Sequence, residues 1–243
     1  MRLARVVRFF RPRPSKISLS VEQILDNNSA VDAVDRFNKL YYESGTAGNL
    51  QWRGIEILKN PCDLWMMLEL IGKVRPSVLI ETGTHCGGSA LYFAEMATLL
   101  GQPCSVITVD INPKLAYRPE DYGVFPVVGY STDTRVAAAV SSILREKLSR
   151  KPGPVMVTLD SDHTQENVAR ELEIYSPHVT PGSYLIVEDT NVNGHPASPD
   201  HGPGPWEAVH EFLARNRTFE IDLSCQRHLL TFFPHGWLRR LSN

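Results

Sequence analysis

From residue 77 onward, short apolar runs alternate with longer segments whose apolar positions recur every three or four residues. This pattern predicts strands alternating with helices, and therefore an α/β fold with a doubly wound, mostly parallel sheet. Two final strands have no room for a helix between them, so we expect them to be antiparallel. The predicted elements are strands 77–82, 105–110, 125–129, 155–160, 184–189, 219–223 and 229–233, and helices 89–100, 134–149, 164–175 and 205–215.

Before residue 77 the sequence pattern predicts helices instead of strands. Residues 20–43 have a helical pattern with Ser20 as a candidate cap, and the glycine-containing residues 43–60 predict a loop. A clear helix follows, because Asn60 suits the N-cap and Pro61 fits the first helical position.

The chain therefore divides into a basic tail and one domain. The tail covers residues 1–19 and is expected to be disordered or bound to a partner. The single domain covers residues 20–243, in which a helical cap (20–75) precedes a Rossmann-like core (76–243).

The charge distribution limits the partners. Six of the 25 basic residues precede the first acid, Glu22, so the rest of the chain carries 19 basic against 27 acidic residues. So acidic a body gives no support for a nucleic-acid substrate. The tail offers only a weak contact with an anionic membrane surface, and no apolar stretch approaches the ~20 residues of a membrane helix. We expect a cytoplasmic protein that forms a homo-oligomer.

A glycine-rich stretch follows the first core strand. Read as G-x-G-x-x-G from Gly83, its middle position is His85, where a dinucleotide site needs a glycine beside the pyrophosphate. Read as E-x-G-x-x-x-G, it suits S-adenosylmethionine (SAM), which has no phosphate. A tight turn without a ligand remains the alternative. The candidate cofactor-binding residues here are Glu81, Gly83, Thr84, His85, Gly87 and Ser89.

Four predicted core strands end in acids. These are Glu81, Asp110, Asp160 and the pair Glu188 and Asp189. Ligands of open α/β sheets bind beyond the carboxyl ends of the strands. Converging carboxylates repel one another unless a cation lies among them. The acids are therefore the strongest indication of a functional site in the sequence.

The acid of the second strand indicates a nucleoside. Asp110 lies 23 residues after Gly87, where an acid can bind a ribose diol of either SAM or NAD. After the third strand, Ser131 or Thr132 is placed to bond the adenine edge. An exposed strand-end acid without a ligand is the alternative for Asp110.

The remaining acids predict a metal site. Asp160, Glu188 and Asp189 are hard oxygen ligands that suit Mg²⁺, Mn²⁺ or Ca²⁺, and Mg²⁺ is the expected ion. Asp160 would also lie beside the cofactor, and Asp162 is the alternative ligand if the strand ends later. A neutral His163 nearby would accept the proton of an acceptor hydroxyl. Helix capping or loop hydrogen bonding explains one such acid but not three.

Three aromatic positions are candidates for the acceptor pocket. Trp52, in the predicted loop, is a candidate lid, although a turn packed on the core is the more common situation. His195 and Trp206 are candidates for lining the pocket, because an aromatic platform suits the apolar face of a sugar.

With these residues identified, the chain resembles the cephalosporin hydroxylase-like family of class I methyltransferases, which includes rhamnosyl and other sugar O-methyltransferases of glycolipid and antibiotic pathways. The resemblance covers about residues 50–240 and excludes the tail. The matching pieces are Glu81-Thr-Gly-Thr-His-Cys-Gly-Gly-Ser-Ala90, Val109-Asp110-Ile111, Gly129-Tyr-Ser-Thr-Asp133, Leu159-Asp-Ser-Asp-His163, Val187-Glu-Asp-Thr190 and Gly202-Pro-Gly-Pro-Trp-Glu-Ala208.

This resemblance implies a SAM-dependent and divalent-metal-dependent O-methyltransferase. The acceptor would be a hydroxyl of a rhamnose-like deoxyhexose on a glycosylated natural product or glycolipid. Asp160, Glu188 and Asp189 would be the metal ligands and His163 the base. The two acids at 188 and 189 depart from the acid-amide pair of catechol-type relatives.

Three alternatives remain open from the sequence. One is a component of cephalosporin 7α-hydroxylation or methoxylation. Another is a SAM-binding or metal-binding module without catalysis, and the third is an NAD-dependent enzyme.

Overall fold

A computed structural model describes Gln23 and residues 27–241 of the 243-residue chain. The basic tail and Ser20, the candidate cap, lie outside the described residues. Among the described residues, no helix is both long enough and apolar enough to cross a membrane.

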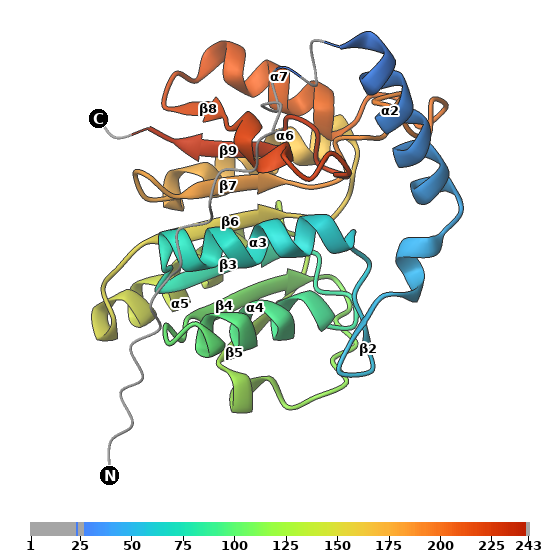
Figure 1. The fold of residues 1–243 in the computed structure, drawn as a ribbon. Helices are drawn as coiled ribbons and strands as arrows, with labels where there is room; N and C mark the ends of the chain where they lie inside the picture. Colours follow the sequence, from blue (N-terminus) through green and yellow to red (C-terminus); the bar gives the residue numbers. More distant parts are fainter. Residues whose placement is uncertain (1–22, 24–26, 242–243) are drawn as a thin grey trace, which may run out of the picture.

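A seven-stranded sheet forms the centre of the molecule, with the strand order β5-β4-β3-β6-β7-β9-β8 (Figure 1). The first five strands in this order are parallel, and β9 runs antiparallel to both of its neighbours. The prediction of a mostly parallel, doubly wound sheet is confirmed. The strands are β3 (Val78–Thr82), β4 (Ser105–Asp110), β5 (Val124–Val128), β6 (Val155–Leu159), β7 (Tyr184–Val187), β8 (Phe219–Ile221) and β9 (Trp237–Arg240).

The prediction of a last strand at residues 229–233 was wrong. Residues 229–233 form a loop, and the final strand is β9. Leu229 has a positive φ of 67°, which a strand does not allow. The backbone of the loop bonds to helices instead of a ladder, because Phe232 N donates to Asp63 Oδ2 (2.8 Å) and Thr231 O accepts from Asn38 Nδ2 (2.6 Å). A strand-like composition was therefore overridden by these tertiary contacts.

Helices cover both faces of the sheet, with α3 and α4 on one face and α5, α6 and α7 on the other (Figure 1). The core helices and the other six strands lie within two residues of their predicted bounds. Asn60 caps α3 as predicted, since its Oδ1 accepts from Cys62 N (2.8 Å). The helices are α2 (Asn28–Glu43), α3 (Pro61–Val74), α4 (Gly88–Leu99), α5 (Thr134–Arg150), α6 (Gln165–Tyr175) and α7 (Pro205–Arg215), with 3₁₀ turns η1 (Thr46–Asn49), η2 (Pro119–Tyr122), η3 (Ser176–His178) and η4 (Leu223–Gln226).

Each central strand is buried on both faces. In β3, Leu79 packs into the cluster beneath α3 and α4, whereas Val78 and Ile80 pack into the cluster beneath the other three helices. This two-sided burial explains why the strand reads as a continuous apolar run, as is typical of parallel sheets.

The segment before α3 lies beside the carboxyl ends of the parallel strands (Figure 1). Helix α2 begins after its N-cap, Asn27, whose side chain accepts from Ala30 N (3.2 Å). The predicted loop at 43–60 contains a short antiparallel hairpin, whose strands β1 (Gln51–Trp52) and β2 (Ile55–Glu56) have two residues each. After β2 the chain passes the strand ends before it enters α3, and this path brings N-terminal residues to the site.

Candidate active site

The glycine-rich loop joins β3 to α4 and lies directly against the end of β6. Gly83 has a φ of +86°, and its N–H donates to Val109 O (2.8 Å). A Cβ at this position would overlap the carbonyl group of Asp160. Gly87 also has a positive φ, of 80°, and forms the N-cap of α4. Both positions therefore require glycine because of their backbone conformation. At Gly83 the close approach of the Asp160 carbonyl group also leaves no space for a side chain.

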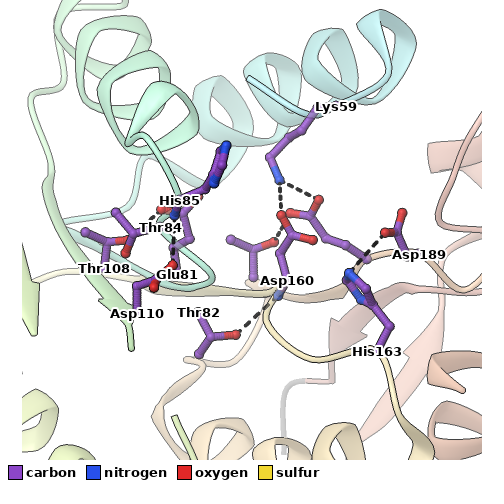
Figure 2. Close-up of polar contacts among 12 residues, drawn as sticks. Lys59, Glu81, Thr82, Thr84, His85, Thr108, Asp110, Asp160, His163 and Asp189 are labelled. Carbon is purple, nitrogen blue, oxygen red and sulfur yellow. Dashed lines mark hydrogen bonds and ion pairs between the residues drawn. The ribbon is translucent and has the colours of Figure 1, made fainter. Parts of the chain in front are cut away.

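His85 and Asp110 fix each other at the mouth of the loop (Figure 2). Asp110 Oδ2 accepts from His85 N (2.8 Å), and its Oδ1 accepts from Asn112 N (2.7 Å). The His85 side chain turns away from Asp110, and its Nε2 lies 2.8 Å from Glu56 Oε2. His85 thus connects the loop to the β1–β2 hairpin.

Glu81 supports the loop through buried hydrogen bonds and does not line a cavity. Its side chain is buried, and Oε2 accepts from Thr108 Oγ1 (2.7 Å), which also bonds Thr84 Oγ1 (2.6 Å). Burial raises the pKa of Glu81 to about 7, against the opposing charge of Lys59. Glu81 is absent from the residues that line the cavity described next, so its contact with the cofactor stays a prediction, and the structure adds an indirect role through the two threonines.

The loop opens into a cavity of about 440 Å³, which is in the size range of small-molecule sites. Gly87 and Thr132 are absent from its lining, whereas the exposed side chains of Ile111 and Tyr130 contribute to it. An isoleucine and a tyrosine there provide apolar walls for a planar ring. The predicted residues that line the cavity are Gly83, Thr84, His85, Ser89, Asp110, Ser131, Asp160, His163 and Asp189.

A cluster of two acids and a histidine lies in the same cavity. Asp160, His163 and Asp189 each offer a ligand atom, and these atoms lie within 4.8 Å of one another. His163 Nε2 is 3.2 Å from Asp189 Oδ2 (Figure 2). Asp162, the alternative to Asp160, is exposed and accepts from Thr164 N (2.9 Å) at the start of α6. Among the described residues, Asp160 is thus the member of the cluster.

Glu188 lies behind the cluster and does not line the cavity. Its side chain is 2% exposed; Oε1 accepts from Thr158 Oγ1 (2.6 Å), and Oε2 accepts from Lys59 Nζ (2.6 Å). Lys59 Nζ also donates to Asp160 Oδ2 (2.8 Å). Glu188 therefore lies behind the cavity lining, and its place in the predicted ligand set of Asp160, Glu188 and Asp189 stays a prediction, because a carboxylate oxygen that accepts one hydrogen bond keeps a second lone pair for a metal.

The charges of the cluster perturb one another. Burial raises the pKa of Asp160 and of Asp189, because a carboxylate loses its hydration there. Burial acts to lower the pKa of His163, but the negative charges of Asp189, Asp160 and Glu188 outweigh it, and the net pKa is raised. A cation bound among these groups would favour the charged carboxylates and the neutral imidazole.

Trp52 is not at the cavity. Its Nε1 donates to Glu95 Oε2 (2.8 Å), and its ring packs edge-on against Tyr92, with ring centroids 5.1 Å apart. Both partners belong to α4. The prediction of a lid is corrected: the residues that do reach the cavity from this segment are 56–59, directly after the hairpin.

His195 and Trp206 lie together, but they are not among the residues lining the cavity. Their rings are stacked with centroids 4.4 Å apart, and His235 also stacks on Trp206 at 4.4 Å. His195 Nε2 lies 3.1 Å from Glu207 Oε1. Two imidazoles already stack on the indole, so the rings form a cluster of their own instead of an open platform.

The sequence reasoning missed Lys59, Glu56, Ile111 and Tyr130. Lys59 is a single basic residue in a segment that predicts a loop, and its partners lie 101 and 129 positions away. No local pattern indicates that pairing. Ile111, in contrast, directly follows β4, and Tyr130 lies two residues after β5, and this position alone was a usable signal.

These features define a class of protein. A parallel sheet, a glycine-rich loop with a histidine in place of a phosphate-binding glycine, and an acid at the tip of the next strand are the features of a class I SAM-dependent methyltransferase.

Comparisons with known proteins agree with this class. A family model described as rhamnosyl O-methyltransferase/CmcI matches residues 44–241. A rhamnosyl O-methyltransferase of Mycobacterium tuberculosis (strain H37Rv) is 38% identical over 192 residues, covering 74% of each chain. One of Mycobacterium leprae is 34% identical over 212 residues, covering 85% of this chain and 90% of the relative. A structure of CmcI with Mg and SAM has a TM-score of 0.60 at 22% identity, covering 80% of this chain and 78% of that one.

The chain therefore belongs to the rhamnosyl O-methyltransferase/CmcI family. It is a SAM-dependent O-methyltransferase with the Rossmann-like fold of that class.

Proposed function

We propose that this enzyme methylates a hydroxyl of a sugar with the help of a divalent cation, Mg²⁺ being the expected ion. The observation that carries the proposal is that the glycine-rich loop and the cluster of Asp160, His163 and Asp189 open into one cavity. A methyl donor held by the loop and an acceptor held by the cluster would therefore meet in the same space.

The cavity fits SAM without requiring a phosphate site. Asp110 would bind the ribose diol, and Ile111 and Tyr130 would contact the adenine ring. Gly83 lets the loop lie directly against the end of β6. When bound, SAM supplies an electrophilic methyl group on a sulfonium.

The cluster fits a divalent cation by its donor set. Asp160 and Asp189 supply hard carboxylate oxygens and His163 an imidazole nitrogen, all within 4.8 Å of one another. Asp160 and Asp189, with Glu188 behind them, would hold the cation, and the chemistry that it would supply is Lewis-acid activation of the acceptor hydroxyl.

His163 is the proposed base. Its Nε2 faces Asp189 Oδ2 at 3.2 Å, which leaves Nδ1 as the ring nitrogen for the proton of the acceptor. Asp189 would stabilise the imidazolium that results and hold the ring in one orientation. The side chain is 29% exposed, so it remains accessible from the cavity.

The acceptor class rests on the relatives. Those of M. tuberculosis and M. leprae are named rhamnosyl O-methyltransferases, and we infer a rhamnose-like deoxyhexose on a glycosylated natural product or glycolipid for this chain as well. Neighbouring sugar hydroxyls can chelate a metal, which explains why a site for such an acceptor would contain metal-binding carboxylates.

The test is turnover with defined acceptors. SAM is titrated calorimetrically, and mass spectrometry follows methylation of rhamnosylated acceptors with and without EDTA. A gain of one methyl group that is lost in EDTA and restored by Mg²⁺ is the expected result. Full turnover in EDTA would refute the metal requirement while leaving the methyltransferase intact.

A second candidate is a component of cephalosporin 7α-hydroxylation or methoxylation, because the matched family also carries the name CmcI. A cephem acceptor is included in the same assay. Modification of the cephem with no methylation of any sugar would favour this candidate. SAM binding without turnover of either acceptor would favour a non-catalytic module.

A further inference from the structure

A second group of metal-binding side chains lies at the glycine-rich loop, distinct from the cluster that contains Asp160. Glu56, His85 and Cys86 each offer one ligand atom, and these three atoms lie within 4.8 Å of one another. The group supplies a carboxylate oxygen, an imidazole nitrogen and a thiol sulfur. Neither the thiol nor the carboxylate has a part in the methyl transfer proposed above.

The backbone brings these side chains together from two separate segments. Glu56 is the last residue of β2, and His85 and Cys86 lie in the loop between β3 and α4. His85 has a φ of +47°, its N–H donates to Asp110 Oδ2 (2.8 Å), and its carbonyl oxygen accepts from Lys114 N (2.8 Å). The loop is thus held with the imidazole towards the hairpin, where its Nε2 lies 2.8 Å from Glu56 Oε2.

The hairpin and the loop are also in direct backbone contact. A Cβ on Gly88 would overlap the carbonyl group of Glu56, so no side chain fits between the two segments there. Packing therefore fixes the spacing of the ligand-bearing backbones. The side chains keep some freedom, since that of His85 is 51% exposed, that of Glu56 is 40% exposed and Cys86 is partly exposed. Small rotations of these side chains are enough to adjust the distances between the ligand atoms.

The donor set selects another class of ion than the acidic cluster does. Mg²⁺ prefers oxygen ligands, whereas a thiolate together with an imidazole favours Zn²⁺ and similar ions. Zn²⁺ binds such ligands tetrahedrally at ~2.0–2.3 Å, which places the ligand atoms about 3.4–3.6 Å from one another. An ion pair between Glu56 and His85 explains two of the three side chains, but it gives no reason for a thiol beside them.

We propose that Glu56, His85 and Cys86 form a second metal site, which takes a thiophilic divalent ion of the Zn²⁺ class. Binding would release the thiol proton of Cys86, and His85 would bind through a neutral ring nitrogen. Glu56 and His85 both line the cavity, so the ion would join two of its walls, the end of the hairpin and the glycine-rich loop.

The test is a Co²⁺ titration of the reduced full chain, with Mg²⁺ in excess to occupy the acidic cluster. Co²⁺ takes the same ligands as Zn²⁺ and absorbs in the near ultraviolet by charge transfer when a thiolate binds it. One equivalent of Co²⁺ is expected to produce this absorption. Competing Zn²⁺ is expected to remove it, which gives the Zn²⁺ affinity of the sulfur-containing site alone.

The variants identify the three ligands. Cys86→Ser is expected to lose the absorption. Glu56→Gln is expected to weaken Zn²⁺ binding at least about tenfold, because even a group behind a metal ligand typically contributes 10- to 100-fold. Cys62→Ser is the matched control, because Cys62 is the other partly exposed cysteine, and it should retain the absorption and the affinity. Asp160→Asn should also retain both, since Asp160 belongs to the acidic cluster.

A measurement on the wild type covers the case in which Cys86→Ser does not fold. Alkylation of Cys86 by iodoacetamide, located by mass spectrometry, should be blocked by Zn²⁺ and not by Mg²⁺. The proposal is overturned if the wild type binds Co²⁺ without the sulfur absorption, if Cys86→Ser retains it, if Zn²⁺ leaves the alkylation unchanged, or if Glu56→Gln binds Zn²⁺ as the wild type does. Each of these results leaves the proposed methyl transfer intact, and loss of methyl transfer in EDTA with rescue by Mg²⁺ is decided separately.

Discussion

Gly83 and Asp160 are in direct backbone contact, although they are 77 positions apart: a side-chain carbon on Gly83 would overlap the carbonyl group of Asp160. The preceding residue adds a hydrogen bond, because Thr82 O accepts from Asp160 N (3.1 Å). The loop proposed to bind SAM and the first acid of the proposed metal site are therefore parts of one rigid unit. A change in the loop backbone must move both.

Gly83→Ala is expected to impair SAM binding and stability together. Alanine at a positive φ costs about 1–3 kcal/mol, and displacement of the Asp160 backbone adds to it. Gly101→Ala is the matched control, because Gly101 has a similar φ of +73° with no atom within 4 Å of a Cβ. Urea unfolding should show a larger loss of unfolding free energy in Gly83→Ala than in Gly101→Ala. Calorimetry should show that Gly83→Ala binds SAM about tenfold more weakly than the wild type, or weaker still. Equal losses in both variants would argue against the close contact.

His163→Ala is expected to lower kcat by about 10²–10⁴, the range of a general base, with SAM affinity within twofold of the wild type. The imidazole must be neutral to accept a proton. kcat of the wild type should therefore rise with pH through the pKa of His163 and then level off. The variant should lack this rise. His228→Ala, at an exposed position, is the control, and a pH profile identical in His163→Ala and the wild type would exclude His163 as the base.

Asp63 is expected to make the protein less stable as the pH rises. Burial raises its pKa to about 8 in the folded state, against 3.8 as the ordinary value. Between these values the folded protein holds a proton that the unfolded chain releases, so the free energy of unfolding falls with rising pH, by at most about 1.4 kcal/mol per unit. Asp63→Asn, which can still accept from Phe232 N, should remove this part of the slope.

The measurement for Asp63 is urea unfolding of the wild type and the variant from pH 5.5 to 8. The stability of Asp63→Asn relative to the wild type should improve with pH. Asp222→Asn is the control: the pKa of Asp222 is lowered, so its contribution is lost only as the pH falls below the range measured. A pH-independent difference for Asp63→Asn would show that Asp63 is ionised in the folded protein.

Trp52→Ala is expected to affect stability and not the acceptor. The indole packs on Tyr92 and donates to Glu95, so its loss should cost about 1–3 kcal/mol in unfolding free energy. The KM for the acceptor should stay within twofold of the wild type, measured in the assay with rhamnosylated acceptors. A large rise in KM with unchanged stability would return Trp52 to the acceptor pocket.

The fold could be predicted because its determinants are local. The apolar runs of β3 and its neighbours, the cap at Asn60 and the glycines of the loop each act through nearby residues, and their spacing is visible in the sequence. The strand predicted at 229–233 failed for the opposite reason. Its backbone partners, Asp63 and Asn38, come from distant helices, and no local preference indicates them.

For the site, the sequence by itself determined the acids and their placement at the strand ends, because a strand end is a local feature and parallel strands end at one edge. Only the tertiary structure decided which acids face the cavity. Glu188 and Asp189 are adjacent in sequence, yet one bonds Lys59 and Thr158 behind the cavity while the other faces His163 within it. The physical reason is that a buried charged side chain points towards an oppositely charged partner. For Glu188 this partner is Lys59, which reaches the site only through the path of the chain before α3.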